Sequence, residues 1–168
     1  RRHNIEVRPV DVLESEWEST LEAPAYQGEI AAKQPAVRLG FQRIKGFKAD
    51  SADRVIHARN YHPIQSIKDI AKRARLDKGD LARLTEGGAF KSLSGHRYQT
   101  HWQVSGLLPP SPLLDKELNV AEPNQQYAPQ KYPEETSVVL PPPLETDDLR
   151  ADYTSLGLTL GRHPMALL

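Results

Sequence analysis

The chain has 168 residues, of which 38% are hydrophobic and 26% charged, so its length is that of about one globular domain. It contains no cysteine, which excludes a disulfide framework and any cysteine-ligated metal site. No apolar run approaches the ~20 residues that a membrane-spanning helix requires. Residues 1–6 lack the apolar stretch of a signal peptide, so we expect a cytoplasmic protein.

The neutral net charge conceals a basic middle. Residues 37–103 contain 14 Lys and Arg against 6 Asp and Glu, a balance of +8. Residues 1–36 contain 4 against 7, and residues 104–168 contain 4 against 9, so both flanks are acidic. This distribution predicts a polyanionic partner for the middle alone.

Two short strands are predicted near the start of the chain. Residues 5–12 alternate apolar and polar side chains, and residues 17–21 do so again. Residues 36–41 can return as a partner strand after a loop that contains prolines and a glycine. We therefore predict a small β-hairpin that leads into the basic segment.

Helical periodicity follows the predicted strands. Asp50 or Ser51 is the expected N-cap of a first helix, which ends before Pro63. Ser66 and Asp77 each precede an Asp by three residues, which is the spacing of a capping box. Two further helices are therefore predicted to begin after these caps.

Glycines and local composition predict the boundaries of the elements after residue 86. Gly87 stops the third helix, and Ser94 opens a fourth. Residues 107–144 are rich in Pro, Gln and acidic side chains, which predicts a long irregular connector. Thr146 is the expected cap of a last helix that ends at Gly157.

The basic middle contains the layout of a helix-hairpin-helix, at Ile44-Lys45-Gly46-Phe47 followed by Ala52 and Val55. In such a motif a glycine turn and a helix N-terminus expose backbone N–H groups, which can hold a DNA phosphate without contact to the bases. The candidate DNA-binding residues are Arg38, Arg43, Lys45, Gly46, Phe47, Lys48, Ser51 and Arg54.

These residues taken alone leave a second interpretation open. A glycine such as Gly46, taken alone, is more often a helix C-cap in any small helical domain. Exposed Lys and Arg are usually a solvated surface. The clustering of cations around one turn within a basic region favours phosphate contact.

Metal and catalytic sites are not predicted. His57 and His62 are five residues apart, as are His96 and His101, which is off the helical spacing of four. No carboxylate is placed to complete either pair as a metal site. The sequence has no Ser/His/Asp set and no Gly-rich nucleotide fingerprint. We therefore assign no catalytic residue, metal or cofactor to this chain.

Several stretches together resemble the C-family bacterial DNA polymerases, related to the α subunit of polymerase III, and most closely the error-prone branch called ImuC. The most specific are Gly-Ala-Phe-x-Ser-Leu at residues 88–93 and the Leu-Gly-Leu to His-Pro pattern at residues 156–164. The other matching stretches are residues 5–12, 37–40, 58–59, 81–87 and 95–97. The resemblance covers nearly the whole chain.

The resemblance implies a mainly α fold with tandem helix-hairpin-helix elements. In these polymerases such a segment follows the fingers and precedes an OB-fold. The palm carboxylates, and the Mg²⁺ expected for the parent polymerase, would therefore lie outside this chain. Lys48 stands where the family favours a second glycine, so its side chain can supply a charge at that position. The implied regions are a fingers-like end with the β-hairpin (1–36), the DNA-binding domain (37–106), the connector (107–144) and a helix before the OB-fold (145–168).

The expected function is that of a DNA-binding segment in an error-prone DNA-directed DNA polymerase for damage-induced translesion synthesis. The alternative is a non-catalytic module that docks a sliding clamp or a mutasome partner. The nearest clamp-contacting candidate, Pro112-Leu113-Leu114, lacks the Gln and the aromatic residue of clamp motifs. A stand-alone helix-hairpin-helix repair protein is a third interpretation.

Overall fold

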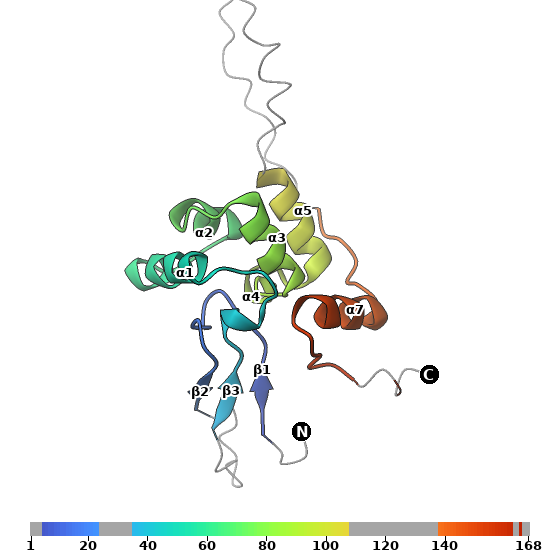
Figure 1. The fold of residues 1–168 in the computed structure, drawn as a ribbon. Helices are drawn as coiled ribbons and strands as arrows, with labels where there is room; N and C mark the ends of the chain where they lie inside the picture. The colour runs from blue at the N-terminus through green and yellow to red at the C-terminus, as the bar shows by residue number, and fades with distance from the viewer. Residues whose placement is uncertain (1–4, 24–34, 108–137, 163–164, 166–168) are drawn as a thin grey trace, which may run out of the picture.

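A small sheet forms one end of the molecule and helices form the rest (Figure 1). The computed structural model describes residues 5–23, 35–107, 138–162 and 165. The helices are α1 (Ala49–Tyr61), α2 (Ile67–Arg73), α3 (Lys78–Glu86), α4 (Lys91–Ser94), α5 (Arg97–Leu107) and α7 (Glu145–Ser155), with a 3₁₀ helix η1 (Phe41–Arg43) before them. The predicted fold class, mainly α with a small sheet at the start, is confirmed.

The sheet has three strands, β1 (Val7–Arg8), β2 (Thr20–Glu22) and β3 (Ala36–Arg38), in the order β1-β3-β2. β2 and β3 pair antiparallel and form the predicted hairpin, whereas β1 pairs parallel to β3, which was not predicted. β1 is shorter than the alternating pattern because the chain leaves the sheet after it. Val12 lies in the core instead, and its backbone N–H donates to the Ala89 carbonyl at 2.9 Å.

Glu22 joins all three strands through two arginines. Its carboxylate accepts from Arg38 Nε at 2.7 Å and from Arg8 Nη1 at 2.5 Å. The hydrogen bond from Arg38, followed by the one from Arg8, lowers the pKa of Glu22 below its ordinary value of 4.5. A carboxyl whose pKa is lowered by folding stabilises the fold above its unfolded-state pKa. That contribution is lost as the pH falls through the folded-state pKa.

We predict that Glu22→Gln removes part of the acid sensitivity of the fold. Wild-type stability should decrease on acidification below about pH 4.5, since protonation of Glu22 disrupts both ion pairs. The variant should be less stable at neutral pH and show a shallower decrease. Urea unfolding across a pH series measures both effects. The matched control is Glu14→Gln, which removes an exposed carboxylate that forms no ion pair within the described residues. A variant with the wild-type pH dependence would contradict the prediction.

Two of the predicted helix caps are confirmed. Ser66 Oγ accepts from the Asp69 N–H at 3.1 Å at the start of α2, and Asp77 accepts from the Asp80 N–H at 2.6 Å at the start of α3. The predicted stop after α3 is also confirmed, because Gly87 is its C-cap.

The other three predicted helix starts are wrong. Ser94 ends α4 instead of opening a helix, because Gly95 with φ +84° terminates α4, and the next helix, α5, begins at Arg97. α1 begins at Ala49 with Lys48 as its N-cap, because the Ser51 side chain is buried against α3. α7 begins at Glu145, one residue before the predicted cap Thr146, and the Leu144 N-cap makes no side-chain hydrogen bond. Three acidic residues in its first turn complement the positive end of the helix dipole instead.

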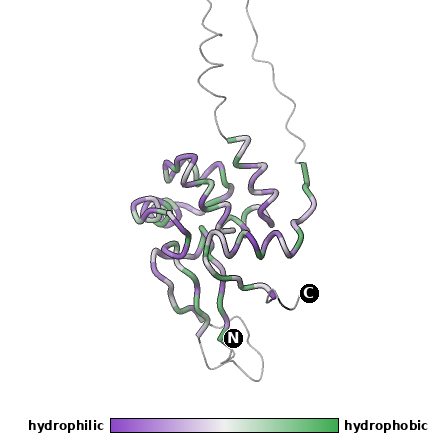
Figure 2. Tube along the Cα trace, turned by 45° about the vertical axis from the view of Figure 1, so that its right-hand side comes forward, coloured by the Kyte–Doolittle hydropathy of each residue, from purple (hydrophilic) through white to green (hydrophobic). Residues whose placement is uncertain are grey.

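One hydrophobic core connects the sheet end, the helices and the last helix. Side chains that are almost fully buried include Val10 and Val12 from the first segment and Phe41, Val55, Ile70, Leu84 and Phe90 from the helical part. Leu156 adds the end of α7 to the same core. Hydrophobic and hydrophilic residues intermingle along each helix (Figure 2), as expected of helices that bury one face.

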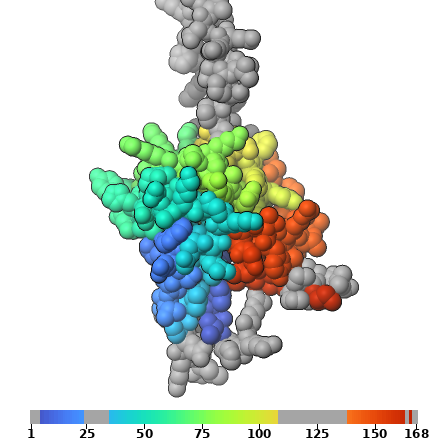
Figure 3. Space-filling model, in the orientation of Figure 1, coloured from blue at the N-terminus to red at the C-terminus, as the bar shows by residue number. Residues whose placement is uncertain are grey.

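α7 lies against the segment that follows the sheet (Figure 3). The Lys45 N–H donates to the Ser155 carbonyl at 2.8 Å, and Ser155 Oγ donates to the Glu86 carbonyl at 3.0 Å. Arg97 on α5 pairs with Asp148 at 2.6 Å and also with Asp152, so α7 is held by charge as well.

The predicted connector lies largely outside the described residues, which resume at residue 138. The segment from there to α7 contains neither helix nor strand. Both polar atoms of the Gln99 side-chain amide, on α5, bind this segment. Nε2 donates to the Val138 carbonyl at 2.9 Å, and Oε1 accepts from the Leu140 N–H at 3.0 Å.

Candidate nucleic-acid interface

The first turn of the helix-hairpin-helix, at residues 44–48 between η1 and α1, is anchored in the core by two apolar side chains. Ile44 and Phe47 are buried, and the Phe47 ring lies 5.7 Å from the Phe41 ring between centroids. Between these anchors Gly46 adopts φ +75°, a left-handed conformation that side chains other than glycine rarely adopt. Lys45 and Gly46 are therefore turned outward and exposed.

The N-terminus of α1 follows this turn directly. Its N-cap residue, Lys48, is exposed and makes no side-chain capping hydrogen bond. The first-turn N–H groups of a helix have no intrahelical acceptor, and the helix dipole is positive there. The turn and the helix start together offer backbone donors and positive potential to an anion.

A cation from the second helical hairpin, which consists of α2, the turn at residues 74–77 and α3, completes this surface. Arg83 Nε lies 3.2 Å from the position that a Cβ on Gly46 would occupy, and Nη1 lies 2.9 Å from the corresponding position on Gly79. The Arg83 guanidinium therefore lies between the first turn and the start of α3. The sequence analysis missed Arg83, because no local pattern shows that a residue on α3 contacts a turn so far back in the chain.

The two hairpins are joined beneath this surface by Asp80, which is only 2% exposed. Its carboxylate accepts from Ser51 Oγ at 2.8 Å and from Arg54 Nη2 at 3.4 Å, and Arg83 Nη1 lies 3.9 Å away. Arg54 Nε also donates to the Ala74 carbonyl at 2.8 Å. Ser51 and Arg54 thus hold the hairpins together.

The structure divides the predicted DNA-binding residues into groups. Arg43, Lys45, Gly46 and Lys48 are exposed in and beside the turn. Phe47 is 6% exposed and anchors the turn. Arg38 is in the sheet, where it binds Glu22 and donates to the Pro9 carbonyl at 3.1 Å.

The clamp-contacting candidate Pro112-Leu113-Leu114 lies outside the described residues. Its role in clamp binding stays a prediction.

The second turn, between α2 and α3, also contains a residue with a positive φ, but its side chains differ from those of the first turn. Arg75 takes the left-handed position, with φ +49°, and the Leu76 N–H donates to the Ala71 carbonyl at 3.0 Å. At the start of α3 the Asp77 carboxylate already accepts a backbone N–H. That carboxylate occupies a backbone donor and repels a phosphate, whereas the N-cap of α1 is Lys48, which leaves the first-turn N–H groups without a side-chain cap, although Asp50 lies in the same turn.

Within the described residues, no group of three or more His, Asp and Glu side chains could hold a metal ion. No helix in the described ranges is long and apolar enough to cross a membrane.

The family comparison agrees with this geometry. The model of the family described as "Helix-hairpin-helix motif" matches residues 4–100, more than half of the chain. The chain therefore belongs to the helix-hairpin-helix family.

The similar proteins are error-prone DNA polymerases. The chain is 43% identical to the error-prone DNA polymerase of Azoarcus sp. strain BH72 over 100% of its length. It is 40% identical to that of Alkalilimnicola ehrlichii over 99%, and 41% identical to that of Pseudomonas fluorescens strain Pf-5 over 100%. The resemblance to error-prone DNA polymerases is thereby confirmed. The chain spans only 14–15% of the length of these relatives.

Proposed function

We propose that this chain is the segment of an error-prone DNA-directed DNA polymerase that holds duplex DNA by its phosphate backbone. The observation that carries the proposal is the first turn, where left-handed Gly46 and the uncapped start of α1 lie beside Lys45, Lys48 and Arg83. The parent enzyme would act in damage-induced translesion synthesis in the bacterial cytoplasm. Its relatives are named as error-prone DNA polymerases, which supports the polymerase part of the proposal.

The arrangement suits a grip that does not depend on sequence. Backbone N–H groups and cations recognise phosphate oxygens, which are the same at every base pair. A polymerase must accept any sequence, so this kind of contact fits its task. Nucleotidyl transfer, with Mg²⁺, would occur in the part of the polymerase that carries the palm.

Duplex binding should depend strongly on salt. Each phosphate contact contributes about −0.9 to the slope of log K against log salt, so four contacts give about −3.6. We expect Lys45→Ala, Lys48→Ala and Arg83→Ala each to flatten the slope by about 0.9 and to weaken binding to every sequence alike. Fluorescence anisotropy on two unrelated blunt duplexes at several salt concentrations measures both effects.

The matched control is Lys68→Ala, which removes an exposed cation from α2, away from the turn. It should leave the slope nearly unchanged. An equal effect of Lys68→Ala, or a clear preference for one duplex sequence, would contradict the proposed grip.

The alternative module that docks a sliding clamp or a mutasome protein makes the opposite prediction. On that view the chain is captured by purified clamp, and Leu113→Ala and Leu114→Ala abolish capture, while duplex DNA is not bound. That combination of results would replace the proposal.

A further inference from the structure

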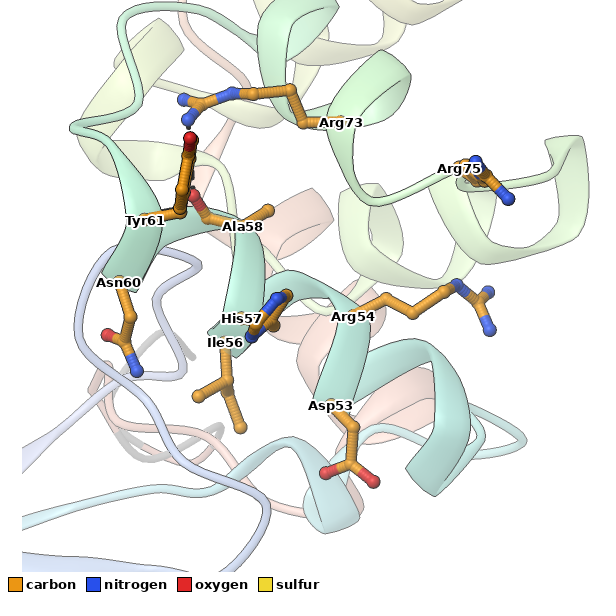
Figure 4. Close-up of a pocket in the computed structure, with 9 residues that line it drawn as sticks. All are labelled: Asp53, Arg54, Ile56, His57, Ala58, Asn60, Tyr61, Arg73 and Arg75. Atoms are coloured by element: carbon orange, nitrogen blue, oxygen red, sulfur yellow. Dashed lines mark hydrogen bonds between the residues drawn. The ribbon is translucent and has the colours of Figure 1, made fainter.

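We propose that a groove along the outer face of α1 binds a short single-stranded DNA segment next to the duplex held at the first turn. The groove is open, has a volume of about 950 Å³, and lies between α1 and the turn after α2 (Figure 4). The polar and aromatic side chains that line the groove and could contact a ligand are those of Arg54, His57, Asn60, Tyr61 and Arg75. This inference rests on the proposed function, because it adds a second contact for the same DNA.

Tyr61 provides a platform for a base. Its side chain is 85% exposed, although it ends a helix that is held firmly in place. Arg73 fixes that helix end, since its Nη1 donates to the Ala58 carbonyl at 3.1 Å and to the His62 carbonyl at 2.8 Å. An exposed aromatic ring on a fixed backbone suits stacking on a nucleobase, which is favourable for any base.

Arg75 provides a cation at a position where glycine would fit better. Its φ of +49° is a left-handed conformation that a residue with a side chain rarely adopts, so the backbone is strained there. The side chain is exposed and lies, like Arg54, on the side of the groove away from Tyr61 (Figure 4). A strained arginine in an exposed turn is a candidate for function, because the fold itself gains nothing from the strain.

The limited positive charge of the groove, beside an exposed aromatic ring, favours a short nucleic-acid segment with a stacked base over a polyacidic peptide. Arg73 is occupied, because it also pairs with Asp69 at 2.6 Å, and Arg54 is shared with Asp80 and the Ala74 carbonyl. Asp53 adds a negative charge at the rim. Few cations therefore remain for a polyacidic partner. One or two cations with an aromatic ring and an amide suit one or two phosphates with a stacked base.

The groove is continuous with the proposed duplex interface. α1 begins at Ala49, directly after the first turn, and the groove runs along the same helix from Asp53 to Tyr61. A strand that leaves a duplex held at Gly46 can therefore follow α1 toward Tyr61. The occupant is thus a single-stranded extension of the same DNA.

The test uses the whole 168-residue chain and three labelled DNAs: a blunt duplex, the same duplex with an oligothymidine overhang, and the oligothymidine strand alone. The overhang should increase affinity over the blunt duplex. Tyr61→Ala should weaken binding of the overhang and of the free strand by about fivefold or more, with Tyr61→Phe close to wild type. Arg75→Gly should flatten the salt slope for the free strand by about 0.7, and Arg75→Lys should retain it.

Arg75→Gly also separates function from folding. Because glycine accepts a positive φ, the variant should melt at or above the wild-type temperature while it loses binding. The controls are Tyr153→Ala, an exposed tyrosine on α7, and Lys91→Ala, an exposed cation on α4. Neither should change binding of the overhang.

Several outcomes would overturn the inference. One is an overhang that adds no affinity, and another is a Tyr61→Ala variant that binds the free strand normally. Capture of a poly-glutamate peptide in place of oligothymidine would assign the groove to an acidic protein partner. If the blunt duplex fails to bind while the free strand binds through Tyr61, the proposed duplex contact at the first turn is wrong, and the groove is a binding site for single-stranded DNA alone.

Discussion

Gly46→Val is expected to lower duplex affinity about tenfold or more and to destabilise the fold by about 1–3 kcal/mol. The destabilisation arises because valine must adopt φ +75°. The loss of affinity arises because its side chain displaces Arg83, whose Nε lies 3.2 Å from the new Cβ, and blocks approach of the backbone to a phosphate. One charge-assisted hydrogen bond to a phosphate contributes about 1.5–3 kcal/mol, which corresponds to about tenfold or more.

Gly95→Val is the matched control for this experiment. Gly95 also has a positive φ, +84°, but no atom lies within 4 Å of the position of its Cβ. The control should lose similar stability and keep its DNA affinity. Thermal melting and fluorescence anisotropy at one salt concentration separate the two effects. If Gly46→Val binds duplex as the Gly95→Val control does, the first turn is not the DNA contact.

Asp80→Ala should be the most destabilising polar substitution that we propose, at about 2–3 kcal/mol. The buried carboxylate accepts from Ser51 at 2.8 Å, and a hydrogen bond to a charged group contributes about 1.5–3 kcal/mol. Its removal leaves the Ser51 hydroxyl buried without its acceptor. Arg54 adds little to the loss, because its side chain is 42% exposed and remains bonded to the Ala74 carbonyl.

Urea unfolding of a double-mutant cycle tests this assignment. Ser51→Ala and Asp80→Ala should show a coupling free energy of about 1 kcal/mol or more, because each removes the same contact. Asp77→Ala serves as the comparison, since it removes only a helix cap and should cost about 1 kcal/mol. Additive effects of the Ser51 and Asp80 substitutions would show that the hairpins are held together in another way.

Local signals in the sequence predicted local structure well. Ser66 and Asp77 cap their helices as expected, because a cap involves residues only three positions apart. The turn at Gly46 was also predicted, since a glycine between two apolar anchors is a short pattern. The same logic failed at Ser51, because its hydroxyl has a closer partner on another helix.

Contacts between distant segments could not be predicted in this way. Nothing near Arg38 in the sequence shows that Glu22 holds it in the sheet. Arg83 and Gly46 meet only because the two hairpins pack together, and Asp80 is buried for the same reason. The basic charge of the middle segment was visible in the sequence, but which cations face outward depends on these long-range pairings.

The hydrogen bond from the Lys45 N–H to the Ser155 carbonyl has a consequence for the order of assembly. It joins residues more than a hundred positions apart, across the long segment before α7. Chain segments that are made first can fold first, and contacts of high sequence separation form late. We therefore expect the sheet and both hairpins to fold while α7 is still being synthesised. The turn that we assign to phosphate binding would then gain its last support only when α7 docks.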